Sequence, residues 1–483
     1  MDATSGKSIL PHIYTNGIID EVNIIPSVTG IVQPNIYKTF IESMNELVPN
    51  TINEWEALPY DWRYDINDVV DNPVVTKNGS YSLVGEIQRL AQNSDTGKVI
   101  IIGHSNGGLI GKVLIEKLKN LGEPNITEKF IMVATPQLGT PQAVTSLLHG
   151  EGLPSDMLPI LMNQSTARKL GEDMSSAYNL LPSKEYFNRV IDPIAMFNVE
   201  DDIATSYIKA YGWNVGNYNE FEKFISGFDG RTKPSEEDTY TPNILNPQYI
   251  QQANSNHDWL DTWSPPEGVE MIQIAGWGID TLSGIHYNRK PIDDIGTMIL
   301  DPEPIMTSDG DDTVVGFSAT ASTTARTFWV DLSSYNSSGF LSSTINRKHK
   351  DILEVTGLKK FIQNLIQEHY DLEENMFIEK PPENNSSKRL RLKIHSPVSL
   401  DLYDSFGNHT GISTSTTGDI RIIDEQIPNS YYLEMGEGKY VGICENGTTT
   451  VKLIGLSTFF KKDVSFFCDR LSVFTIPFKI PIN

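Results

Sequence analysis

One stretch constrains the fold of this chain more than any other: residues 99–109, Val-Ile-Ile-Ile-Gly-His-Ser-Asn-Gly-Gly-Leu. Its four consecutive β-branched residues predict a buried parallel strand. Residues 103–107 then match the pattern G-x-S-x-G, and apolar residues recur at helical spacing after it. A strand, a tight turn and a helix form the setting in which this pattern exposes a nucleophilic serine. We therefore predict that Ser105 is a nucleophile rather than part of a structural turn.

The residues around the serine also indicate how a negative charge would be stabilised beside it. Gly103 and Gly107 are expected to let the strand and the helix approach closely. The backbone N–H of Asn106, the residue after the serine, is one candidate donor of an oxyanion hole. The other candidate is Val28, in the loop after an expected first strand at residues 21–25; the alternative is an ordinary connecting loop.

A serine hydroxyl is a weak nucleophile near neutral pH, so an imidazole must take its proton and a carboxylate must orient the imidazole. Around G-x-S-x-G these groups follow the chain order Ser, Asp or Glu, His. Here an acidic turn containing Asp309, Asp311 and Asp312 is followed by His349. Spacing alone does not decide among the three aspartates. A calcium loop is the alternative for this turn, but the D-x-D-x-D-G pattern is missing.

His349 is selected from nine histidines by elimination. The others lie too early in the chain, beside the serine, before the acidic turn, in a helical pattern or near the C-terminus: His12, His104, His149, His257, His286, His369, His395 and His409. We expect His104 to point away from the site. The alternative for His349 is a surface position in a basic turn with Lys348 and Lys350.

Hydrophobic patterns predict an α/β fold with a mostly parallel sheet flanked by helices. Residues 54–59, 130–134 and 269–276 have strand patterns. Between residues 142 and 264 the strand pattern stops for longer than any ordinary loop, which indicates an inserted helical cap. An apolar part of this insertion, residues 147–162, fits either a lid that meets acyl chains or the core of the cap itself.

The pattern changes again near the C-terminus. We expect an α/β-hydrolase-like domain over residues 1–375, a linker rich in proline, asparagine and serine over 376–388, and a β-sandwich domain over 389–483. The last region is predicted to be a sandwich because apolar residues alternate with period two in six to eight short segments. It holds no catalytic pattern, and its binding partner is unknown.

Composition excludes several classes of function. With 62 acidic and 38 basic residues, the net charge of −24 argues against nucleic-acid binding and against a membrane contact made by charge alone. Cys444 and Cys468 allow one disulfide at most and define no disulfide framework. No apolar run approaches the roughly 18 residues of a membrane span, and residues 1–10 lack the apolar segment of a signal peptide. We expect a cytoplasmic protein unless a leader precedes this sequence.

Five motifs, in this order, resemble the lecithin:cholesterol acyltransferase and lysosomal phospholipase A family of α/β-hydrolases over about residues 18–370. They are Pro-Tyr-Asp-Trp-Arg at 59–63, Gly-His-Ser-Asn-Gly-Gly at 103–108, Leu-Gly-Thr-Pro at 138–141, Asp-Gly-Asp-Asp-Thr-Val at 309–314 and the His349 segment. The resemblance implies that Asp311 is the triad acid, and it supports Val28 and Asn106 as oxyanion donors. This sequence departs from the family at Ser27, where glycine is usual. It also lacks the cysteine pair that pins the lid in animal members, and it shows no secretory leader.

Asp61 and Arg63, in the first of these motifs, are expected to form a structural ion pair around Trp62 rather than to act in catalysis. The whole pattern predicts a serine hydrolase of carboxylic esters, with acyl lipids as substrates, transient contact of the cap with a lipid interface, and no metal or organic cofactor. The alternatives are acyl transfer to an alcohol, peptidase or amidase activity, and a non-catalytic binding protein on a hydrolase fold.

Overall fold

The computed structural model describes residues 7–9, 13–15, 17–18, 35–151, 163–198, 204–291, 298–338, 346–383, 389–395, 398–414, 421–444, 449–455 and 464–468. The expected first strand at residues 21–25, the oxyanion candidate Val28 and the apolar residues 153–162 lie outside this set.

A five-stranded sheet with the order β11-β10-β7-β4-β3 lies at the centre of the larger part of the molecule. Its strands are β3 (Val99–His104), β4 (Thr127–Val133), β7 (Glu270–Trp277), β10 (Arg326–Asp331) and β11 (Met376–Ile378). The first four are parallel, and β11 is antiparallel at the edge. Phe130 to Val133 are fully buried, because β4 is covered on both faces, as its continuous apolar run predicts. The expectation of a mixed α/β fold with a parallel sheet is confirmed.

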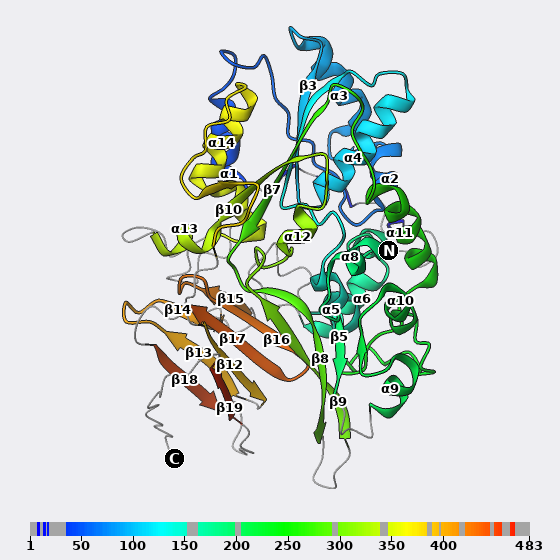
Figure 1. Ribbon diagram of the computed structural model, residues 1–483, viewed down its shortest axis with the longest axis vertical. Coiled ribbons are helices and arrows are strands. Elements are labelled where there is room, and N and C mark those ends of the chain that lie inside the picture. Colours follow the sequence, from blue (N-terminus) through cyan, green and yellow to red (C-terminus); the bar gives the residue numbers. More distant parts are fainter. Residues whose placement is uncertain are drawn as a thin grey trace.

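Helices cover both faces of this sheet (Figure 1). On one face, α1 (Lys38–Asn45) and α14 (Thr356–Ile366) pack with Ile131 and Val133. On the other side lie α2 (Ile66–Asp71), α3 (Leu83–Asn93) and α4 (Asn106–Asn120), which share a second hydrophobic cluster. A small hairpin, β1 (Val74–Thr76) and β2 (Gly79–Tyr81), lies between α2 and α3 in sequence. Three short helices follow sheet strands or precede α14: α12 (Gly316–Ala319), α13 (Leu332–Ser338) and the 3-10 helix η1 (His349–Glu354).

The long segment after β4 is mainly helical. Its helices are α5 (Pro141–His149), α6 (Gln164–Glu172), α7 (Ser175–Tyr178), α8 (Lys184–Arg189), α9 (Thr205–Tyr211), α10 (Tyr218–Ile225) and α11 (Pro247–Leu260). It also contains β5 (Ala195–Phe197) and β6 (Asn214–Val215), which join β8 (Thr281–Pro291) and β9 (Met298–Thr307) in a four-stranded sheet. The unit therefore draws on strands beyond residue 264 and is not purely helical. Leu147 and Leu148 lie fully buried in its core.

The C-terminal region contains strands only, among the residues described from 389 onward. They are β12 (Arg389–His395), β13 (Val398–Tyr403), β14 (His409–Thr414), β15 (Arg421–Glu425), β16 (Tyr431–Met435), β17 (Gly438–Cys444), β18 (Thr450–Gly455) and β19 (Val464–Cys468). They form two antiparallel sheets, β16-β17-β12-β19 and β15-β14-β13-β18. Side chains from both sheets share one hydrophobic cluster. Cys444 lies on β17 and Cys468 on β19, the two strands that flank β12 in the first of these sheets.

Two further expectations differ from the structure. Residues 54–59 form no strand; side chains hold this segment instead, as where Trp55 donates its indole N–H to Asn45 Oδ1 at 2.8 Å. Residues 376–378, expected within a linker, form β11 because Met376 is buried against the sheet.

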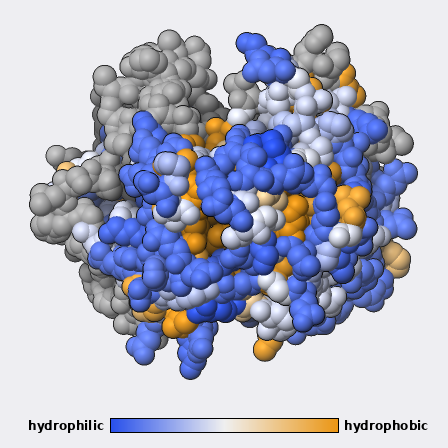
Figure 2. Space-filling view, turned by 90° about the horizontal axis from the view of Figure 1, so that it is seen from above, coloured by the Kyte–Doolittle hydropathy of each residue, from blue (hydrophilic) through white to orange (hydrophobic). Residues whose placement is uncertain are grey.

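In the described part of the chain, no helix is both long enough and apolar enough to cross a bilayer. The face seen from above is largely hydrophilic, with hydrophobic side chains gathered near its centre (Figure 2).

Candidate active site

The turn between β3 and α4 holds Ser105 in a strained backbone conformation. Its φ angle is +54°, a region that non-glycine residues rarely adopt. The turn is fixed on both sides, because the N–H of Ser105 donates to the Val133 carbonyl at 2.9 Å and its carbonyl accepts from Gly108 at 3.0 Å. The strain therefore persists through contacts with the neighbouring strand.

Close packing of the turn depends on Gly103 and Gly108. A Cβ atom at Gly103 would lie 2.6 Å from the Gly107 carbonyl oxygen, and one at Gly108 would lie 2.0 Å from Thr135 Oγ1. A Cβ at Gly107 would meet only the Tyr60 hydroxyl, at an ordinary 3.9 Å. The expectation is confirmed for Gly103, whereas Gly108 rather than Gly107 allows the helix to approach.

Three of the predicted residues lie in one hydrogen-bonded series. His349 Nε2 is 2.8 Å from Ser105 Oγ, and His349 Nδ1 is 2.9 Å from Asp311 Oδ2. The backbone N–H of His349 also donates to the Asp311 carbonyl at 2.8 Å. Ser105 follows β3, Asp311 follows β9, and His349 is the first residue of η1, so three segments distant in sequence meet at one end of the sheet.

The structure separates the three aspartates that spacing left open. The carboxylate of Asp311 is 1% exposed, and its other oxygen accepts N–H groups of Thr313 at 3.2 Å and Val314 at 2.7 Å. These donors hold it in one orientation. The carboxylate of Asp312 instead pairs with Lys348 at 3.0 Å. A Cβ at Gly276 would lie 2.6 Å from Asp311 Cβ, so β7 needs glycine there to make room for the acid.

His104 has a place in this site that sequence reasoning missed. Its Nδ1 accepts from the Tyr37 hydroxyl at 2.7 Å, and its Nε2 lies 2.9 Å from the His349 carbonyl oxygen. Burial, together with the charge of His349, lowers the pKa of His104 to about 3, so it stays neutral. The expectation that His104 points away is wrong: it supports the backbone of the residue that bonds to the serine.

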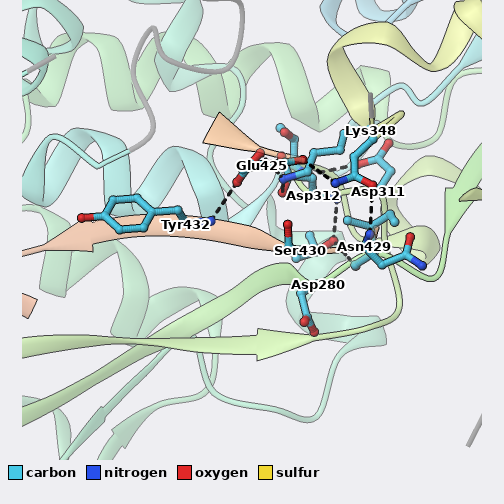
Figure 3. A network of polar contacts seen from close by, with 12 residues as sticks. Asp280, Asp311, Asp312, Lys348, Glu425, Asn429, Ser430 and Tyr432 are labelled. Atoms are coloured by element: carbon cyan, nitrogen blue, oxygen red, sulfur yellow. Dashed lines mark hydrogen bonds and ion pairs between the residues drawn. The ribbon is translucent and has the colours of Figure 1, made fainter. Parts of the chain in front are cut away.

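The segment around His349 is not a solvated basic turn. Lys348 is 2% exposed and forms ion pairs with Asp312 at 3.0 Å and with Glu425 of the C-terminal region at 2.8 Å (Figure 3). Burial lowers the pKa of Lys348, but the two carboxylates outweigh it and raise the pKa above its usual value. Lysine is therefore charged here although it is buried.

The oxyanion candidates are described only in part. Asn106 is the first residue of α4, so its N–H has no partner within the helix and points out of the positive end of the helix dipole. Val28 lies outside the described residues. In the part of the chain that the structure covers, no group of three or more His, Cys, Asp or Glu side chains is arranged to hold a metal ion.

The expected ion pair of the first motif is present. Arg63 binds Asp61 through two hydrogen bonds, from Nε to Oδ1 at 2.8 Å and from Nη2 to Oδ2 at 2.6 Å. Trp62, between them in sequence, packs against the core of the helical segment. The pair orders this loop, and the N–H of Arg63 also donates to Asp61 Oδ1 at 3.2 Å.

A serine hydroxyl, an imidazole and a buried carboxylate in series can carry out acyl transfer through a covalent intermediate. Comparisons with known proteins bear on this chemistry. No curated protein matches the chain. Among solved structures, the Tle4-Tli4 complex is 14% identical, covering 64% of this chain and 68% of that one with a TM-score of 0.37. The propeptide form of Bacillus licheniformis lipase BlEst2 is 12% identical, covering 82% and 65% with a TM-score of 0.29. At such TM-scores these likenesses add nothing to the assignment.

A comparison with protein-family models identifies a match over most of the chain. The sequence model of lecithin:cholesterol acyltransferase matches residues 26–354, which is well over half of the chain and includes Ser105, Asp311 and His349. This chain belongs to the lecithin:cholesterol acyltransferase family of α/β-hydrolases.

Proposed function

We propose that this protein is a serine hydrolase that cleaves carboxylic esters of lipids through an acyl-enzyme. One observation carries the proposal: His349 bonds to Ser105 at 2.8 Å and to Asp311 at 2.9 Å, beside a serine held at φ +54°. Membership of a family named for lipid acyl transfer supports the substrate class. The same membership supports either a hydrolase or an acyltransferase, and we propose hydrolysis of carboxylic esters as the reaction.

In the proposed mechanism, Ser105 Oγ attacks the ester carbonyl carbon while His349 Nε2 takes the hydroxyl proton. The carbonyl oxygen becomes an anion, which the backbone N–H groups of Asn106 and Val28 stabilise. The C–O bond to the alcohol then breaks, and His349 returns the proton to the leaving alcohol oxygen. Water attacks the acyl-enzyme with the same proton transfers and releases the fatty acid and Ser105. Asp311 keeps the imidazole in the tautomer that leaves Nε2 free to accept.

We interpret the remaining architecture in the same terms. Residues 1–375 form the hydrolase domain, the insertion over about 142–264 is a cap above the sheet, and 389–483 is a β-sandwich domain whose partner is unassigned. The cap is the part that we expect to contact a lipid interface transiently. The burial of Leu147 and Leu148 supports the interpretation that these two residues belong to the core of the cap rather than to an acyl-binding surface.

The proposal is tested by hydrolysis of p-nitrophenyl esters from short to long acyl chains, with Ser105→Ala beside the parent. Loss of the serine is expected to lower kcat/KM by about 10³-fold or more. A fluorophosphonate probe should label the parent and not the variant. An inactive, unlabelled parent would favour the alternative of a non-catalytic binding protein.

Acyl transfer to an alcohol is the second candidate, and the family match favours it. Both reactions share the acyl-enzyme and differ only in the molecule that attacks it. Product analysis with a lipid ester and an added long-chain alcohol separates them: a new ester indicates transfer, and fatty acid alone indicates hydrolysis.

A further inference from the structure

The C-terminal strand region contacts the segment that carries His349. Asn346 donates its amide N–H groups to the Glu425 and Ile427 carbonyls, both at 2.6 Å, and its side-chain oxygen accepts the N–H of Asn429 at 2.9 Å. These three bonds join the residues just before η1 to the connection between β15 and β16. The two segments are about 80 residues apart in sequence, with separations of 79, 81 and 83 for the three pairs.

Charge continues the same contact toward the site. Glu425 uses one carboxylate oxygen to accept the Tyr432 N–H at 2.8 Å, and its other oxygen accepts Lys348 Nζ at 2.8 Å (Figure 3). Lys348 in turn donates to Asp312 at 3.0 Å. Lys348 is the residue before His349 and Asp312 is the residue after Asp311. The charges of Asp312, Lys348 and Glu425 therefore link the segments that carry Asp311 and His349 to β15 of the C-terminal region.

The backbone of Asp312 has an unfavourable conformation that these contacts help to hold. Its φ angle is +96°, which is unfavourable for any residue with a side chain. Such a conformation persists only when surrounding contacts impose it. The N–H of Asp312 donates to Thr281 Oγ1 at 2.8 Å, and Lys348 holds the carboxylate. Asp311 is the residue directly before this position.

We propose that the C-terminal strand region is part of the catalytic centre, and that Glu425 is a positioning residue that acts through Lys348 on Asp311 and His349. This inference rests on the proposed function. Glu425 does not reach the reacting atoms; it fixes the lysine that joins the two connections. The hydrolase site is complete only when the C-terminal strands are docked on it.

The direct test is Glu425→Gln in the full chain, followed by kcat and KM on a p-nitrophenyl ester and by the rate of fluorophosphonate labelling. Glutamine can keep the bond to Tyr432 but cannot neutralise Lys348. Because small displacements of reacting groups are costly, we expect kcat and the labelling rate to fall about 10- to 100-fold, with KM within about twofold of the parent. A loss confined to KM, or no loss, would overturn the proposal.

Glu434→Gln is the matched control. Glu434 lies on β16, where it pairs with Arg421 at 2.8 Å and accepts the Tyr432 hydroxyl at 2.7 Å, on the same pair of strands but away from Lys348. Like Glu425→Gln, the Glu434→Gln substitution removes one negative charge from the C-terminal strand region. We expect this variant to keep kcat within about twofold, so an equal loss in both variants would overturn a specific role of Glu425.

A double-mutant cycle tests the route through Lys348. If Glu425 acts only through this lysine, Glu425→Gln should lower kcat no further once Lys348→Met is present. Independent, multiplicative losses would overturn that route. If Glu425→Gln yields no folded protein, Asn346→Ala tests the other part of the proposal, because it removes the neutral contacts to the C-terminal region and leaves every charge in place. An unchanged kcat would then overturn the proposal that this region is part of the catalytic centre. An inactive parent overturns the proposed function as well, whereas an active parent with an unaffected Glu425→Gln variant overturns this inference alone.

Discussion

His349 in the candidate site and His409 in the C-terminal strands are buried histidines that each bond to aspartate. His349 has a carboxylate on Nδ1, Asp311, and a hydroxyl on Nε2, Ser105. His409 has carboxylates on both sides: Asp424 is 3.0 Å from Nδ1 and Asp401 is 3.0 Å from Nε2. The ring of Tyr403 stacks on His409 at 4.8 Å between centroids.

The difference in partners decides what each imidazole does with its proton. Burial alone would lower the pKa of His409, but hydrogen bonds and charges from both aspartates outweigh it and raise the pKa to about 9. His409 is therefore a permanent cation near neutral pH, and it neutralises two buried carboxylates. His349 has Asp311 on one ring nitrogen and the Ser105 hydroxyl on the other, and in the proposed mechanism it accepts and returns a proton. The charge of His409 stabilises the C-terminal strands, whereas in the proposed mechanism His349 exchanges a proton with Ser105.

The largest effect that would sharpen this contrast is on activity. His349→Gln removes the proton acceptor of Ser105, so we expect kcat/KM for a p-nitrophenyl ester to fall about 10³- to 10⁴-fold. His409→Gln should leave kcat/KM within about threefold of the parent under conditions where it is folded. The thermal midpoint of His349→Gln should stay close to that of the parent. An active His349→Gln variant would remove the basis of the comparison.

The second effect is on stability, where we expect the larger loss in His409→Gln and the smaller loss in His349→Gln. His409→Gln leaves two buried carboxylates without their cation, and breaking a buried pair in this way costs about 3–5 kcal/mol. Urea unfolding at pH 7 should show this loss for His409→Gln and a much smaller change for His349→Gln. Equal stability of the His409→Gln variant and the parent would mean that the charge stored between Asp401 and Asp424 does not hold these strands together.

The third effect is the pH dependence of that stability. The pKa of His409 is raised from 6.5 to about 9, so between these values the folded protein keeps a proton that the unfolded chain has lost. The stabilisation is complete below about pH 6.5 and is lost as the pH rises through 9, by about 3 kcal/mol in total. Urea midpoints from pH 6 to pH 10 measure it. His409→Gln should flatten this part of the curve, and a parent curve that is already flat would contradict the assignment.

Local sequence signals predicted the parts of the site that depend on neighbouring residues. The β-branched run and G-x-S-x-G gave β3, the strained turn and α4, because strand, turn and helix are contiguous. The acidic turn could be located but its three carboxylates could not be separated, since their orientation depends on Gly276 and on N–H groups within the turn. The resemblance to the family, rather than spacing, favoured Asp311.

Contacts between distant segments could not be predicted in this way. Lys348 looked like a solvated residue in a basic turn, because its partners Asp312 and Glu425 are 36 and 77 residues away. The failure at residues 54–59 and the edge strand at 376–378 have the same origin. A short apolar segment becomes a strand only where an edge is available for pairing, and the sequence does not show which edges remain open.

The smallest effect concerns His104, whose partners are also distant: Tyr37 is 67 residues away and His349 is 245. His104 holds the backbone of His349 through a neutral hydrogen bond, so we expect His104→Gln to lower kcat about tenfold with little change in KM. Tyr37→Phe is the matched control; it removes only the contact to Nδ1 and should cost less. Because the pKa of His104 is about 3, neither variant should move the limbs of the pH–activity profile between pH 5 and 9. A shifted limb in His104→Gln would show that this histidine titrates together with His349. The contrast between a histidine that exchanges its proton and one that keeps a fixed protonation state, which His349 and His409 illustrate, would then not apply to His104.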